Sequence, residues 1–95
     1  MFSIIKLFYA AFIHTDFGVT CSDNGFIDLS NDQECLDAVN YAKSFNREAN
    51  YIKEVSREFD PKGCFIYETG NMFFNLHSTG RNNVYTRSIC KTGNK

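Results

Sequence analysis

The chain of 95 residues lacks several features that mark well-defined protein classes. It has no tryptophan, a single proline, no Gly/Ser-rich linker and no internal repeat, so nothing indicates a second domain. No two cysteines are close enough for a zinc knuckle or a Cys-x-x-Cys redox motif. Phosphate-binding loops, Gly-x-Ser-x-Gly, His-Glu-x-x-His and dinucleotide fingerprints are also missing. We therefore expect one domain that has no metal or cofactor and is not an enzyme.

Charge of one sign is missing from the end of the chain. The net charge is −1, which gives no reason to expect nucleic acid as a partner. Nine acidic and four basic residues lie between Cys21 and Asp60, whereas no acidic residue follows Glu68. The simpler interpretation is a solvated surface with a basic tail, and the alternative is a weak anion-binding or acidic-partner face. The basic residues of this last part are Arg81, Arg87, Lys91 and Lys95.

The apolar and cysteine content indicates a small disulfide-stabilised domain. The sequence is 43% hydrophobic, with ten phenylalanines and five tyrosines, which is enough for a core. A chain this short buries only a modest fraction of its surface. Its four cysteines are an even number, separated by 13, 28 and 25 residues. This pattern favours two disulfides, provided that the compartment is oxidising.

The N-terminus resembles a signal peptide of atypical form. Lys6 precedes the apolar run 7–13, which is too short to span a bilayer and fits a signal-peptide core. His14 and Asp16 then interrupt the segment before Cys21. Two alternatives are an N-terminal strand of the fold and a start site that is not the true beginning of the protein. We expect residues 1–20 to be a signal peptide and 21–95 to be a secreted or extracellular domain without a membrane span.

One helix is predicted from about Asn31 to Phe45. Ser30 and Gln33 have the spacing of a capping box. Apolar residues then recur at steps of three and four and form one stripe, which includes Cys35.

Strands account for most of the rest of the fold. The segments 26–29, 51–58, 64–67 and 72–75 have strand patterns, Asp60–Gly63 is a turn, and 84–90 is a final strand or a turn of helix. The segments 64–67 and 72–75 should form a hairpin. The fold class is therefore α+β, with one helix packed on a small antiparallel sheet. Of the three possible cysteine pairings we favour Cys21–Cys90, between the termini, with Cys35–Cys64, between helix and sheet.

Polar and aromatic residues gather in the segment 71–83. Asn71, Asn75, His77 and Arg81 are the candidate ligand-binding residues, because amides and a guanidinium beside aromatic rings suit recognition of a sugar or peptide. The alternative is that these polar groups satisfy the local backbone in turns.

Several short motifs resemble a four-cysteine module of predicted secreted and surface proteins of algae and other protists. They are Glu34-Cys35-x-x-Ala38, Pro61-Lys62-Gly63-Cys64, Met72-Phe73-Phe74-Asn75 and Ile89-Cys90-Lys91. The resemblance covers residues 21–91 and departs from the module at Val39, where the module has a second alanine. It implies cystines and an extracellular setting, without an activity or a ligand.

We expect a non-enzymatic recognition or structural module of the cell exterior, with a glycan or protein as ligand. One alternative is a secreted effector such as a toxin or a protease inhibitor that uses the loop Asp60–Gly63. The other is a small hydrolase that uses His77.

Overall fold

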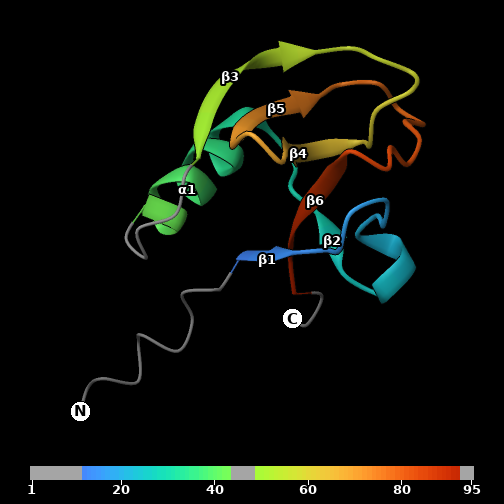
Figure 1. Ribbon diagram of the computed structural model, residues 1–95, viewed down its shortest axis with the longest axis horizontal. Coiled ribbons are helices and arrows are strands. Elements are labelled where there is room, and N and C mark those ends of the chain that lie inside the picture. The colour runs from blue at the N-terminus through green and yellow to red at the C-terminus, as the bar shows by residue number, and fades with distance from the viewer. Residues whose placement is uncertain (1–11, 44–48, 93–95) are drawn as a thin grey trace.

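A computed structural model describes residues 12–43 and 49–92. It has one α-helix and six strands (Figure 1). In chain order the elements are β1 (Phe12–His14), the 3-10 turn η2 (Ser22–Asn24), β2 (Ile27–Asp28), α1 (Asp32–Lys43), β3 (Asn50–Val55), β4 (Gly63–Tyr67), β5 (Asn71–Asn75) and β6 (Thr86–Lys91). The α+β class is confirmed, and the final segment is a strand. The predicted last residue of the helix, Phe45, and the basic residue Lys95 lie outside the described residues.

The helix α1 begins close to the predicted position, but the residue that caps its N-terminus lies one position later than predicted. The Glu34 amide donates to Asn31 Oδ1 at 2.9 Å, so Asn31 caps the helix in place of Ser30. The Glu34 carboxylate reaches back and accepts from the Ser30 amide. Four residues form the buried stripe: Cys35, Ala38, Val39 and Ala42.

The sheet is mixed, which corrects the expectation of a purely antiparallel one. Its order is β1-β6-β4-β5-β3, with β2 also paired to β6, and every pair except β3–β5 is antiparallel. The strands β3, β4 and β5 reverse direction in turn, so β3 and β5 point the same way. Because β5 lies between β3 and β4 (Figure 1), it pairs with β3 in parallel. A bulge between Tyr51 and Lys53 leaves Ile52 half-exposed on this edge strand.

The main core lies between α1 and one face of the sheet. Alternate residues of the β4–β5 hairpin enter it, among them Ile66, Met72 and Phe74. The other face carries an aromatic cluster, in which the Phe65 and Phe73 rings stack with centroids 5.6 Å apart. Phe65 is fully buried, so both faces of the sheet are covered.

Both favoured disulfides are confirmed. Cys21–Cys90 joins the segment before η2 to β6, and Cys35–Cys64 joins α1 to β4. Their Cα atoms are 5.7 and 5.6 Å apart, within the usual range for cystines. The second cystine links the helix stripe to a strand start, so it anchors α1 to the sheet.

Residues 12–20 pack as part of the domain. The strand β1 pairs with β6 from Phe12–Lys91 to His14–Ile89, which is the N-terminal-strand alternative. Thr15 is buried, and its amide donates to Ser88 O at 3.0 Å. The predicted signal peptide remains a prediction, since residues 1–11 lie outside the described residues. Within 12–43 and 49–92, no helix is long and apolar enough to span a bilayer.

Candidate functional site

Asn75, one of the four predicted ligand-binding residues, is a buried structural brace. Its Nδ2 group donates to three backbone carbonyls, those of Arg57, Asp60 and Pro61, at 2.8 to 3.0 Å. Its Oδ1 atom accepts from the amides of Arg57 and His77. The side chain is 1% exposed, so the whole amide serves to hold the loop after β3 against the end of β5.

The other three predicted residues do not converge on a ligand site with Asn75. His77 Nδ1 lies 3.2 Å from the amides of Thr79 and Gly80, which matches the alternative of local backbone satisfaction. Arg81 lies over the Phe59 ring and forms an ion pair with Glu58 at 3.5 Å. Asn71 is exposed at the start of β5, at the opposite end of that strand from Asn75.

A buried carboxylate that sequence reasoning missed ties these loops together. Asp60 is 5% exposed, and its Oδ1 accepts from Asn83 Nδ2 at 2.8 Å. Arg57 forms an ion pair with Asp60 Oδ2 at 3.4 Å and lies over the Phe73 ring. Burial and the neighbouring Asp60 raise the pKa of Tyr67. Because its polar atoms are partnered within the fold, this network is structural.

The strongest candidate site is a hollow of 310 Å³ that we call the Arg87 pocket. It is lined by His14, Phe17, Ile66, Tyr67, Glu68, Gly70 and Arg87. The Arg87 guanidinium carbon lies 4.5 Å from the centroid of the Phe17 ring, which is 41% exposed. The Nε atom of Arg87 is buried without a hydrogen-bond partner. Such atoms are uncommon in folded proteins, and Tyr51 OH and Ser88 Oγ share this property here.

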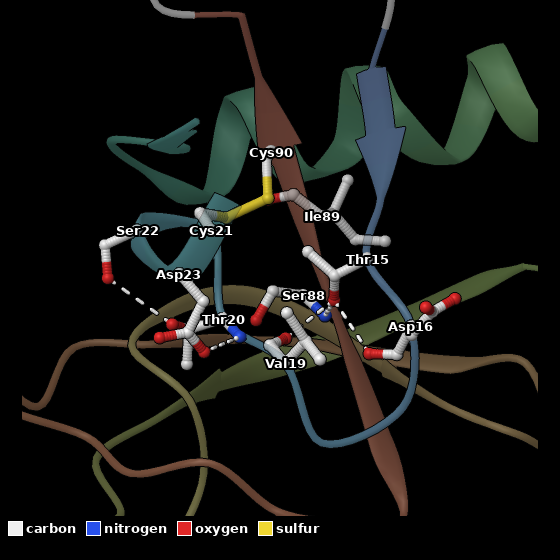
Figure 2. Close-up of a disulfide and its surroundings, with 10 residues drawn as sticks. All are labelled: Thr15, Asp16, Val19, Thr20, Cys21, Ser22, Asp23, Ser88, Ile89 and Cys90. Atoms are coloured by element: carbon white, nitrogen blue, oxygen red, sulfur yellow. Dashed lines mark hydrogen bonds between the residues drawn. A yellow bond between two sulfur atoms is a disulfide. The ribbon is translucent and has the colours of Figure 1, made fainter. Parts of the chain in front are cut away.

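The segment that supplies His14 and Phe17 is held to β6 by specific hydrogen bonds. The Ser88 amide donates to Thr15 Oγ1 at 2.9 Å, and that hydroxyl donates to Val19 O at 2.7 Å (Figure 2). The Gly18 amide donates to Thr86 O at 2.9 Å. Beside them, Cys21 is bonded to Cys90, so both ends of this segment are fixed to the same strand.

A second hollow, of 410 Å³, lies between β2 and the ends of β4 and β5. Exposed Ile27 and Leu76 line it together with Asp28 and Lys62. Burial raises the pKa of Asp28, and the Lys62 charge opposes that shift. Lys62 and Asp28 influence each other without an ion pair within the described ranges, and Arg87 likewise forms no ion pair with a carboxylate of its own pocket.

Among residues 12–43 and 49–92 no cluster of three or more His, Cys, Asp or Glu side chains could hold a metal ion. No family model, curated protein or solved structure matches the chain. The resemblance to the four-cysteine module therefore stays a prediction.

The sequence indicated one residue of the Arg87 pocket and gave no indication of the others. The excess of basic residues after Glu68 drew attention to Arg87. His14 and Phe17 lie in the segment interpreted as a signal peptide, so nothing marked them as site residues.

Proposed function

We propose that the chain is a secreted or cell-surface recognition module without enzymatic activity, which binds its ligand at the Arg87 pocket. The observation that carries this proposal is the Arg87 side chain, held over Phe17 with a buried, unsatisfied Nε at the wall of an open hollow. A volume of 310 Å³ is at the low end of the range of about 300 to 1,000 Å³ typical of ligand pockets.

The two disulfides support an oxidising location and a rigid scaffold. Loop-closure entropy alone gives about 4.4 kcal/mol for Cys21–Cys90 and about 3.6 kcal/mol for Cys35–Cys64. These contributions are comparable to the whole free energy of unfolding of a small domain, about 5 to 15 kcal/mol. A scaffold cross-linked by two disulfides holds its backbone rigid, which lowers the entropic cost of binding.

The alternatives receive less support from the geometry. In the loop Asp60–Gly63 only Lys62 is exposed, whereas a protease inhibitor needs an accessible loop. The hydrolase alternative requires His77 beside a carboxylate and a nucleophile, but the His77 ring contacts two backbone amides and the Thr79 hydroxyl.

The proposal is tested by heteronuclear NMR of the oxidised, isotope-labelled protein. The probes are neutral and acidic monosaccharides and single amino acids, each at millimolar concentration. We expect at least one probe to shift the amide signals of Glu68, Gly70 and Arg87 together. The Arg87→Gln variant should lose these shifts, and Arg81→Gln, which removes an exposed arginine elsewhere, should retain them. If no probe shifts the pocket signals, or if all shifts fall around Asp28, the pocket is not the recognition site.

A further inference from the structure

We propose that the Arg87 pocket recognises an acidic sugar, a pyranose that carries one carboxylate or sulfate group. This inference rests on the proposed function and specifies the class of its ligand.

The charge pattern at the end of the chain gives the first step. Of the basic residues after Glu68 that the structure describes, Arg81 is paired with Glu58 and Lys91 with Glu34, whose Oε2 lies 3.0 Å from Nζ. Arg87 has neither a carboxylate partner nor a hydrogen bond within the described ranges; its contact is the Phe17 ring. Desolvating part of a guanidinium without an anion is costly. An anion bound in the hollow would pair with the terminal N–H groups of the guanidinium, since the Nε atom itself is buried from the surface.

The shape of the Arg87 side chain gives the second step. A guanidinium offers parallel N–H groups that match the oxygens of a carboxylate or sulfate. The Phe17 ring holds this group in place by a cation–π contact and does not neutralise its charge. The binding group is therefore orientated before the ligand arrives, which reduces the entropy lost on binding.

The rest of the pocket favours a sugar over a simple inorganic anion. Glu68 lines the same hollow and forms no ion pair with Arg87. Its carboxylate can accept hydrogen bonds from the several hydroxyl groups of a sugar. Half-exposed Phe17 offers apolar surface to a sugar ring. The Arg87 guanidinium, the Glu68 carboxylate and the Phe17 ring together fit a ligand with a single acidic group and several hydroxyls.

The N-terminal segment is part of this specificity. His14 and Phe17 both come from residues 12–20. The Thr15–Ser88 hydrogen bond holds that segment against β6 (Figure 2). A chain that begins at Cys21 would lack two of the pocket's lining residues. The acidic-sugar site therefore requires residues 12–20, and it is incompatible with removal of residues 1–20 as a signal peptide.

The test compares sugars that differ only in the acidic group. Methyl β-glucuronide is titrated against methyl β-glucoside, and galactose 6-sulfate against galactose, with NMR shifts of the oxidised full chain as the readout. We expect the acidic member of at least one pair to bind at least tenfold more tightly and to weaken as sodium chloride rises from 50 to 500 mM. The two pairs distinguish a carboxylate from a sulfate.

Three variants with intact melting curves act as controls. Arg87→Gln should abolish the preference for the acidic sugar, and Arg81→Gln should leave it unchanged. Arg87→Lys keeps the charge but loses the paired N–H groups, so it should give an intermediate preference. Equal binding of acidic and neutral sugars, or binding of amino acids alone, would overturn the acidic-sugar inference while the pocket remained a recognition site. A pocket that no probe perturbs would overturn the proposed function itself.

Discussion

Replacing Thr15 with valine tests whether residues 12–20 belong to the folded domain. The Thr15 side chain is 3% exposed; its hydroxyl accepts from the Ser88 amide at 2.9 Å and donates to Val19 O at 2.7 Å. Valine has nearly the same shape, so packing is retained while both hydrogen bonds are lost. An unsatisfied buried donor costs about 1 to 3 kcal/mol and the lost acceptor contact adds about 1 kcal/mol. We expect Thr15→Val to lower the free energy of unfolding by about 2 to 4 kcal/mol.

The assay is thermal and urea unfolding under oxidising conditions, followed by circular dichroism. For a domain of this size each kcal/mol shifts the melting temperature by about 4 to 8 °C, so the midpoint should fall by roughly 10 °C or more. Thr20→Val is the matched control, because the Thr20 hydroxyl makes exposed contacts with Ser22 and Asp23; it should change stability by less than about 0.5 kcal/mol. Equal, negligible effects of both substitutions would refute the packing of residues 12–20. An intact mass from the native source that places the mature N-terminus at Cys21 would do so as well.

Three further predictions concern the rest of the fold. Asn75→Asp places a carboxylate oxygen against three backbone carbonyls and should cost about 3 kcal/mol or more at pH 7. Stability should partly recover near pH 4 as the acid becomes protonated, and exposed Asn71→Asp should have little effect; a neutral outcome for both in urea unfolding would contradict the brace. The double change Cys35→Ala and Cys64→Ala should remove about 3 to 4 kcal/mol, and reduction of both disulfides about 8 kcal/mol. An unchanged melting curve in strong reductant would refute the cystine account. Partial burial would raise the pKa of Glu34, but the Ser30 amide and Lys91 together lower it. The stability that this group contributes is thus present above its unfolded pKa of 4.5 and is lost as the pH falls. Glu34→Gln should therefore reduce the loss of stability at acidic pH. An unchanged loss would count against the Lys91 pair.

Much of the fold could be predicted from local sequence patterns. The apolar stripe predicted the helix, and the neighbouring strand segments 64–67 and 72–75 predicted the β4–β5 hairpin, because side-chain periodicity and turn geometry depend on nearby residues. The same stripe placed Cys35 toward the sheet, which made the pairing with Cys64 predictable. The roles of the candidate ligand-binding residues were harder to predict. Asn75 is of a residue type that often binds ligands, and only its burial reveals that it braces a loop.

Local sequence patterns predicted the α+β class, the helix and the hairpin, and they favoured the cystine pairing that the structure confirms. Long-range packing instead places β5 between β3 and β4, makes β3 parallel to β5, and brings residues 12–14 into the sheet beside β6. Periodicity tells which way a side chain faces along its strand, but it does not specify the neighbouring strand. The Arg87 pocket depends on such a long-range choice, since it brings Phe17 against a residue 70 positions later in the chain.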